Sequence, residues 1–349
     1  MNIMISIECL DKNIDFQKTS LFHSFKERPL GFIDIGSAGG VHPLIAPVAS
    51  LTHCTCFEPD ERACQELRDK YGHGGPFPTL SIVNTAIGSK TGNGTLYMTE
   101  SPVNTSLLKP NEELVTRYKV AGFRLQKVGD IKTSTLDDVV FGGGNREMPL
   151  GEVIKMDCQG AEHQIIQGAR RVLKEQCLAV WCEFEFFPMY RNQKLFSEVD
   201  LLLRQEGFQL YGLYPNYISA KKIDRRKYNS EERLAWADAF YLKDPLEVDN
   251  EHSTFSARNI EVLLLVSMLT GYFDYALELI DGYYQTKTND QERLKKLVLA
   301  LAEEQRKGLE ADLKQLLVEF QRTPEMGYLL GKKFIDKHKS NNNIDFISI

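Results

Sequence analysis

Two apolar segments near the start of the chain each end in an acidic residue, and glycines follow the first of them. The first segment leads into D-I-G-S-A-G-G, in which Asp34 precedes Gly36, Gly39 and Gly40. About twenty residues later, the second leads into C-F-E-P-D, which contains Glu58. Glycines let the backbone approach a ligand closely, and an acid at the tip of the next strand can accept hydrogen bonds from both hydroxyls of a ribose. The spacing therefore predicts a site for an adenosine group.

The glycine turn by itself is compatible with two cofactors, a nicotinamide dinucleotide and S-adenosylmethionine. It reads D-I-G-S-A-G-G rather than G-x-G-x-x-G, and its acid, Asp34, stands where it could meet a cationic amino-acid group. That acid favours S-adenosylmethionine. A tight turn between a strand and a helix, without a ligand, is the simpler alternative.

A third acidic group follows the apolar segment V-I-K-M and reads D-C-Q-G-A-E, beginning at Asp157. In an open parallel sheet, such strand tips meet at the edge where ligands bind. A further segment, W-C-E-F-E-F-F-P-M-Y, places Glu183 and Glu185 on one face by its period of two, among aromatic residues that would raise the pKa of a carboxyl group. We therefore expect three catalytic acids: Glu185 as a general base, Glu183 as a positioning group, and Asp157 as a residue that faces the cleft. A structural acid paired with Arg191 or with a backbone amide is the alternative for Glu185.

Other polar residues near these motifs are candidates for substrate contacts. Ser106 lies in the polar segment S-P-V-N-T-S-L-L-K-P-N, and Tyr190 ends the aromatic segment. His163, after G-A-E, and His42, after the glycine turn, are alternative bases, although each is as readily a surface residue. Gln159 offers hydrogen bonds without charge. No acidic pair has clear ligand spacing for a divalent ion, so we assign no metal.

The composition of the chain bounds these possibilities. Its 349 residues exceed one average domain, and 42% hydrophobic residues are ample for a packed core. A net charge of -6 and a pI near 5.8 argue against nucleic acid as the main partner. Seven scattered cysteines and the lack of a signal-peptide pattern predict a cytoplasmic protein with free thiols. The longest apolar stretch, Val262 to Thr270, is too short to span a membrane.

The elements that would position the acids alternate between short apolar strands and helical segments over residues 31–245. This alternation predicts an α/β fold with a mostly parallel sheet covered on both faces. We place strands at 31–35, 52–57, 80–84, 153–157, 179–183, 208–213 and 239–242, and helices at 61–71, 161–174 and 196–206. Residues 1–30 form a lead-in, and the insertion 88–135 is expected to close over the pocket as a substrate lid, with a solvated excursion as the alternative. Residues 246–349 are expected to form an all-helical extension.

The helical extension carries an apolar stripe over Leu263 to Leu269. A short helix in solvent would not expose so much apolar surface. We therefore expect these helices to form a homodimer or dock a partner. Packing of the stripe back on the sheet is the alternative.

Taken in order, the motifs resemble those of FkbM-type, class I S-adenosylmethionine-dependent methyltransferases over about residues 30 to 243. The matching segments are F-I-D-I-G-S-A-G-G, C-F-E-P-D, V-N-T-A-I-G, N-T-S-L-L-K-P-N, T-S-T-L-D-D, I-K-M-D-C-Q-G-A-E, I-I-Q-G-A, C-E-F-E-F-F-P-M-Y, L-F-S-E-V-D and W-A-D-A-F. The resemblance implies a Rossmann-like, seven-stranded, mostly parallel sheet with one reversed strand. It also implies that Glu58 binds the ribose and that residues 84–86 flank the adenine. The cofactor contacts expected at this site are Asp34, Gly36, Ser37, Gly39, Gly40, Glu58, Pro59, Asp60, Asn84, Thr85 and Ala86.

The family often has an acidic residue at the position of Gln159, and the neutral amide here weakens any role of this position as a base or metal ligand. The resemblance implies O-methylation of a hydroxyl on a sugar, glycan or glycan precursor, with a polyketide or other secondary metabolite as the alternative acceptor. A non-catalytic adenosine-ligand sensor or assembly subunit, and a nicotinamide-dependent oxidoreductase, are alternatives from other classes. The sequence identifies neither the acceptor nor the oligomeric state.

Overall fold

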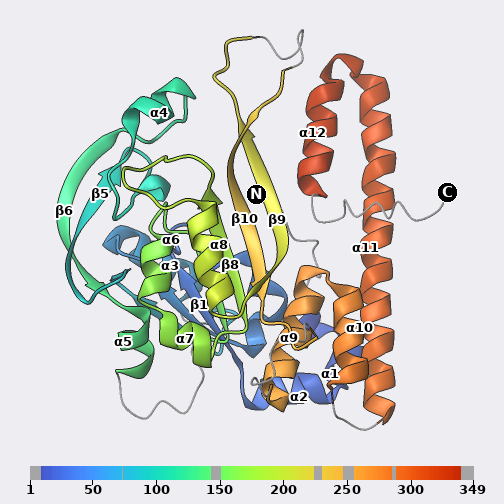
Figure 1. Ribbon diagram of the computed structural model, residues 1–349. Helices are drawn as coiled ribbons and strands as arrows, with labels where there is room; N and C mark the ends of the chain where they lie inside the picture. Colours follow the sequence, from blue (N-terminus) through green and yellow to red (C-terminus); the bar gives the residue numbers. More distant parts are fainter. Residues whose placement is uncertain are drawn as a thin grey trace.

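A computed structural model describes residues 9–72, 74–142, 151–223, 230–246, 255–284 and 288–338. Its central sheet contains β1 (Leu30–Ile35), β2 (Thr52–Phe57), β3 (Thr79–Val83), β7 (Val153–Met156), β8 (Ala179–Glu185), β9 (Gln209–Ile218) and β10 (Arg233–Leu242). The strand order is β3-β2-β1-β7-β8-β10-β9 (Figure 1). β10 runs antiparallel to β8 and β9, and the other neighbouring pairs are parallel. The predicted seven-stranded sheet with one reversed strand is confirmed.

Several element boundaries agree with the sequence pattern, and three strands, β8, β9 and β10, extend at least two residues beyond it. β2 and the following helix, α3 (Glu61–Tyr71), have the expected bounds. β9 and β10 are longer than expected because they continue as a hairpin past the neighbouring strands (Figure 1). This hairpin brings the tip of the sheet next to the C-terminal helices.

The helix expected over 161–174 is wrong as a single element. It is divided into α6 (Glu162–Gln167) and α7 (Arg170–Glu175) at Gly168. A Cβ at Gly168 would lie 2.2 Å from the carbonyl oxygen of Gly88, so the backbone here packs directly against the start of the insertion. α7 begins as a separate helix because the carboxylate of Asp137 accepts hydrogen bonds from two backbone amides of α7.

Helices cover both faces of the sheet, and the strands alternate their side chains between two cores. On one face, Phe32 and Trp181 share a core with helices from both ends of the chain. These helices are η1 (Leu10–Lys12), α1 (Ile14–Gln17), α2 (Ser20–Glu27), η2 (Pro43–Leu51), α3, α9 (Ala257–Thr270) and α10 (Phe273–Gly282). On the other face, Ile33 and Val180 pack under α5 (Leu136–Phe141), α6, α7 and α8 (Phe196–Gln205).

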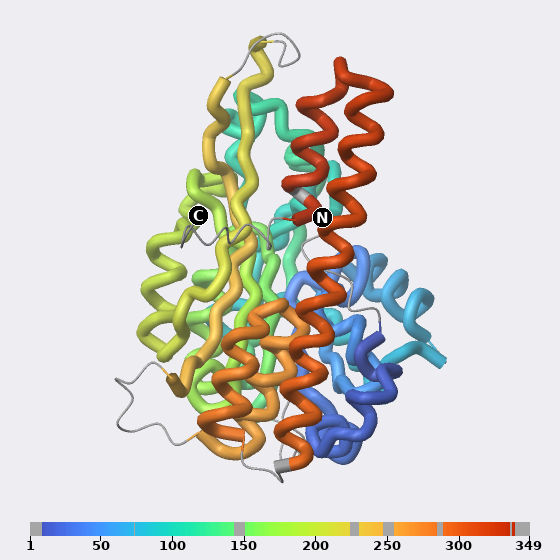
Figure 2. The backbone as a smooth tube through the Cα atoms, turned by 90° about the vertical axis from the view of Figure 1, so that its right-hand side faces the viewer, coloured from blue at the N-terminus to red at the C-terminus, as the bar shows by residue number. Residues whose placement is uncertain are grey.

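The apolar stripe from Leu263 to Leu269 lies on α9 and packs back on the sheet, where its residues are at most 4% exposed. The stripe therefore completes the core instead of facing a partner. α11 (Thr288–Arg322) begins against the same core and then runs past it (Figure 2). It turns through η4 (Pro324–Met326) into α12 (Gly327–Lys337), which lies beside the β9–β10 hairpin (Figures 1 and 2). None of the helices within the described ranges is long and apolar enough for a membrane span.

The insertion forms a small sheet with β4 (Ala86–Ile87), β5 (Gly92–Thr99) and β6 (Leu125–Ser134), together with η3 (Pro102–Asn104) and α4 (Glu112–Arg117). Backbone hydrogen bonds fasten it to the chain that follows β8. The amide of Asn111 donates to the carbonyl of Met189 at 2.9 Å, and the amide of Arg191 donates to the carbonyl of Lys109 at 2.8 Å. The insertion is thus docked over the carboxyl edge of the sheet.

Candidate active site

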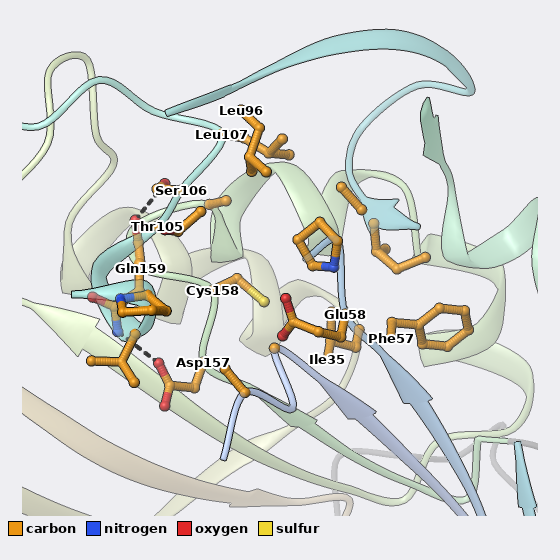
Figure 3. Close-up of a pocket in the computed structure, with 18 of the residues that line it drawn as sticks. Ile35, Phe57, Glu58, Leu96, Thr105, Ser106, Leu107, Asp157, Cys158 and Gln159 are labelled. Atoms are coloured by element: carbon orange, nitrogen blue, oxygen red, sulfur yellow. Dashed lines mark hydrogen bonds between the residues drawn. The ribbon is translucent and has the colours of Figure 1, made fainter. Parts of the chain in front are cut away.

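A cavity of ≈ 340 Å³ opens at the carboxyl ends of β1, β2 and β7, with residues of the insertion on its opposite wall (Figure 3). Open α/β sheets bind ligands at this edge, and small-molecule sites have volumes of about 300 to 1,000 Å³. The predicted site residues on its wall are Gly36, Glu58, Pro59, Thr85, Ala86, Ser106, Asp157 and Gln159. The predicted residues that do not line it are Asp34, Ser37, Gly39, Gly40, Asp60, Asn84, His163, Glu183, Glu185 and Tyr190.

Gly36 has a φ of 79° and lies directly against the loop that follows β7. A Cβ at this position would be 2.0 Å from the carbonyl oxygen of Asp157, so a larger residue would force the two loops apart. This glycine is therefore required by the contact between two strand tips, in addition to any close approach of a ligand. Gly39 also has a positive φ, 89°, but a Cβ there would meet nothing within 4 Å.

Lys155, absent from the predicted site, is the buried partner of Asp34. Its Nζ lies 3.2 Å from Asp34 Oδ1 and donates to the carbonyl oxygen of Gly36 at 2.8 Å. Burial works to lower the pKa of Lys155, but the carboxylates of Asp34 and Asp157 raise it above its usual value, so the ammonium stays charged. It ties the glycine turn to β7. The sequence feature that could have identified Lys155 is its place inside the apolar segment V-I-K-M, because a buried lysine requires a paired charge.

Asp34 itself is fully buried beneath the glycine turn. Its Oδ2 accepts a hydrogen bond from the backbone amide of His42 at 2.7 Å, and the hydroxyl of Ser37 donates to its carbonyl oxygen at 2.9 Å. Burial, and then the charge of Lys155, lower the pKa of His42 to about 3, so this imidazole is neutral at pH 7. Contact between Asp34 and the cationic group of a donor stays a prediction.

Glu58 lies on the cavity wall at the tip of β2 and is 5% exposed. Burial raises the pKa of Glu58 to about 7, against the effect of the Asp60 amide, which donates to its Oε1 at 2.9 Å. The side chain of Asn84 donates to the carbonyls of Glu58 and Pro59 at 3.1 and 3.0 Å. Asp60 accepts from the amide of Arg62 at 2.8 Å and caps α3. Asn84 and Asp60 thus shape the loop that presents the acid.

The surroundings of Glu58 fit an adenosine group. Ile35, Phe57 and Ile87 provide apolar wall, which suits a purine ring, and Thr85 borders the same space. The carboxylate of Glu58 can accept hydrogen bonds from two ribose hydroxyls when it is ionised. The residues present therefore suit the nucleoside end of S-adenosylmethionine, the cofactor predicted from the sequence.

Gln159 joins two of the acids predicted to be catalytic. Its Nε2 donates to Asp157 Oδ1 at 2.9 Å and to Glu183 Oε2 at 3.0 Å. The hydroxyl of Tyr190 lies 2.9 Å from Gln159 Oε1 and 3.0 Å from the carbonyl oxygen of Asn104. Burial, and then the charge of Asp157, raise the pKa of Glu183 well above its usual value. The side chain of Asp157 is 39% exposed and borders the cavity (Figure 3).

The insertion reaches this group of acids through Ser106. Its hydroxyl donates to the backbone carbonyl of Gln159 at 2.8 Å (Figure 3), and it accepts from the amide of Leu108 at 3.0 Å. Gln159 has a φ of 56°, which is uncommon for a residue with a side chain. Its backbone carbonyl and its side-chain amide both take part in this network. One set of hydrogen bonds therefore links the insertion, Gln159 and the acids. The lid role of the insertion stays a prediction.

Glu185 and His163 lie away from this cavity. Glu185 is buried, and burial followed by the charge of Glu162 raises the pKa of Glu185 well above its usual value. His163 lies on α6 in the field of Lys194, and burial lowers the pKa of this histidine. Their proposed chemical roles stay predictions.

A family model described as the methyltransferase FkbM domain matches residues 34–210. Among solved structures, the FkbM methyltransferase from Methylobacillus flagellatus KT is 16% identical with a TM-score of 0.32, and the match covers 61% of this chain and 43% of that chain. This chain thus spans less than half the length of that protein. Precorrin-6y C5,15-methyltransferase from Geobacter metallireducens GS-15 is 10% identical with a TM-score of 0.31, and the match covers 69% of this chain and 94% of that chain. No curated protein matches the sequence.

Proposed function

Because the chain belongs to the FkbM methyltransferase family, we propose that it transfers a methyl group from S-adenosylmethionine to a hydroxyl of a sugar, glycan or glycan precursor. The observation that carries the proposal is a single cavity with Glu58 on its wall near β2 and Asp157 on its wall near β7. A nucleoside and an acceptor hydroxyl each require one of these polar groups. A polyketide or other secondary metabolite is the alternative acceptor.

The wall near β2 serves the cofactor. When bound, S-adenosylmethionine supplies a methyl group on a positively charged sulfur, which an oxygen nucleophile can attack in line. Glu58 would accept hydrogen bonds from the ribose hydroxyls, and Ile35 and Phe57 would pack against the adenine. These residues would hold the nucleoside on the β2 side of the cavity, and Asp157 lines the β7 side of the same cavity.

The wall near β7 serves the acceptor. Asp157 is the member of the predicted catalytic acids that lines the cavity, so we assign to it the proton of the acceptor hydroxyl. Gln159 holds Asp157 Oδ1, and Glu183 binds the other amide hydrogen of Gln159, which makes Glu183 a positioning residue. Lys155 Nζ, 3.9 Å from Asp157 Oδ2, supplies a positive charge beside the acids. Glu185, which is buried and does not line the cavity, is the alternative base.

The test combines cofactor binding with methyl transfer. Binding of S-adenosylhomocysteine is measured by calorimetry, and transfer is measured on a panel of monosaccharides and oligosaccharides as hydroxyl-dependent release of S-adenosylhomocysteine. We expect Asp157→Asn to lower kcat by about 10² to 10⁴, the usual contribution of a general base, while cofactor affinity is retained. Glu113→Gln is the matched control, because the Glu113 side chain is 90% exposed and lies on α4.

Two results would redirect the proposal. If Asp157→Asn keeps wild-type kcat and Glu185→Gln loses it, Glu185 is the base. If the wild type binds S-adenosylhomocysteine but methylates no hydroxyl, the sensor or assembly alternative replaces the enzyme.

A further inference from the structure

A second hollow, of ≈ 460 Å³, lies between the β9–β10 hairpin and α12. We call it the hairpin groove and define it by Asn216, Tyr217, Glu232, Trp236, Tyr328 and Lys332. Figures 1 and 2 show that the hairpin and α12 run side by side. No residue of the groove belongs to the cavity that contains Glu58 and Asp157.

Aromatic rings and hydrogen-bonding groups share this groove. Tyr217 and Tyr328 are each 51% exposed, and Trp236 is half-buried. Aromatic side chains offer flat apolar faces together with polar tips, and small-molecule sites combine such faces with a few placed polar groups. The C–H faces of sugar rings pack on aromatic rings, and sugar hydroxyls bind amide and charged groups such as those of Asn216 and Glu232.

The charges of the groove favour a neutral ligand. Lys332 Nζ lies 3.5 Å from Glu232 Oε2, so the positive charge already has a negative partner. A phosphate-bearing ligand would need unpaired cationic groups. A neutral molecule rich in hydroxyls can bind both partners of the ion pair without separating them.

The groove and the acids are linked through the pairing of β8 with β10. On β10, Asp238 is paired directly with Glu183 of β8, and Trp236 is two residues further along the same strand. Two residues along a strand span roughly 6.5 Å and paired strands are about 5 Å apart, which separates the backbones of Trp236 and Glu183 by roughly 8 Å. Gln159 Nε2 donates to both Glu183 and Asp157, so Asp157 belongs to the same group of acids. A ligand that contacts both the groove and these acids has to extend along β10, which suits a chain of sugar rings.

We infer that the hairpin groove binds the part of a neutral oligosaccharide or glycan chain that extends away from the methylated ring. This inference rests on the proposed function and makes the acceptor a glycan chain rather than a monosaccharide. Tyr217, Trp236 and Tyr328 pack against sugar rings, and Asn216 and the Glu232–Lys332 pair bind hydroxyls. The C-terminal helices thereby contribute to acceptor choice.

Gly331 offers a variant that fills the groove without disturbing the fold. It lines the groove on α12, and a Cβ there would meet nothing within 4 Å. Leucine also favours a helix more than glycine does. Gly308→Leu is the matched control, because Gly308 is an exposed residue of α11 whose added Cβ would likewise meet nothing within 4 Å.

The experiment compares wild type, Gly331→Leu, Tyr328→Ala and Gly308→Leu on an array of neutral monosaccharides and oligosaccharides, with S-adenosylhomocysteine affinity measured on each. We expect oligosaccharides to bind more tightly than monosaccharides, and Gly331→Leu and Tyr328→Ala to weaken oligosaccharide binding about tenfold or more. Gly308→Leu should bind as the wild type does. S-adenosylhomocysteine affinity should be the same in all four proteins, because the groove and the cofactor cavity share no residue.

The outcomes separate this inference from the proposed function. Absence of glycan binding by the wild type, equal binding of monosaccharides and oligosaccharides, or wild-type binding by Gly331→Leu would overturn the inference. Methylation of oligosaccharides with the same kcat/KM in wild type and Gly331→Leu would also overturn it, while the proposed function would stand. Groove-dependent glycan binding without any methyl transfer would retain the groove and reject the proposed function.

Discussion

The affinity of the protein for S-adenosylhomocysteine should increase between pH 6 and pH 8, and Glu58 should be the cause. Burial raises the pKa of this carboxyl group to about 7 in the free protein. Two ribose hydroxyls are donors, and an ionised carboxylate offers acceptors to both, whereas a protonated one offers a competing donor. The ligand therefore binds the ionised form, and protonation of Glu58 opposes binding.

The expected size of the effect follows from the pKa of about 7. Glu58 is ionised in about 9% of the free protein at pH 6 and in about 91% at pH 8. Apparent affinity scales with the fraction of the competent form, so the association constant should rise about tenfold over this interval. At pH 7, binding should release about half a proton, because half of the free protein must lose one.

Isothermal titration calorimetry at pH 6, 7 and 8 measures both quantities. Repeating the pH 7 titration in buffers of different ionisation enthalpy gives the number of protons released. The control is Glu58→Gln, which keeps the side-chain volume but cannot ionise and has a donor in place of one acceptor oxygen. It should bind more weakly than wild type at pH 8 and show an affinity that changes little between pH 6 and 8.

Two results would refute the reasoning. A wild-type affinity that is constant from pH 6 to 8 would mean that Glu58 is not the titrating contact. A tenfold rise that persists in Glu58→Gln would assign the effect to another group, the first candidate being Asp238, whose pKa burial raises to about 6.

Further predictions concern the glycine turn and the helical extension. Gly36→Ala should lower both the melting temperature and S-adenosylhomocysteine affinity, because its Cβ would lie 2.0 Å from the carbonyl oxygen of Asp157. Gly39→Ala has open space around the added Cβ, so it should lower the free energy of unfolding only by the backbone strain, about 1 to 2 kcal/mol. Equal losses in the two variants, measured by thermal unfolding and calorimetry, would contradict the role of the loop contact. Leu264→Ala should lower the free energy of unfolding by about 2 to 5 kcal/mol, because Leu264 is fully buried in the core shared by α9 and the sheet. Leu299→Ala, at a residue 57% exposed on α11, should change it by no more than about 0.5 kcal/mol in urea unfolding, and similar values for the two would show that the extension folds apart from the sheet.

The order of apolar strands and helices, and the acids at the strand tips, could be predicted from the sequence. A strand buried on both faces has to be a short apolar run, and the residue that follows it has to leave the sheet at the edge where ligands bind. Those requirements are local, so the residues around Asp34, Glu58 and Asp157 are enough to predict them. The same reasoning located the insertion, because its turn-rich composition interrupts the alternation.

Partnerships between distant residues depended on the tertiary structure. Lys155 pairs with Asp34 across neighbouring strands. Gln159 donates hydrogen bonds to Asp157 and Glu183 from a backbone with positive φ, which its residue type does not predict. The sequence shows that the stripe on α9 is apolar. Whether the sheet or a partner covers it depends on where the C-terminal helices pack in the folded chain. Hydrophobic periodicity records that a surface is buried, whereas the identity of what buries it is set by contacts between segments far apart in the chain.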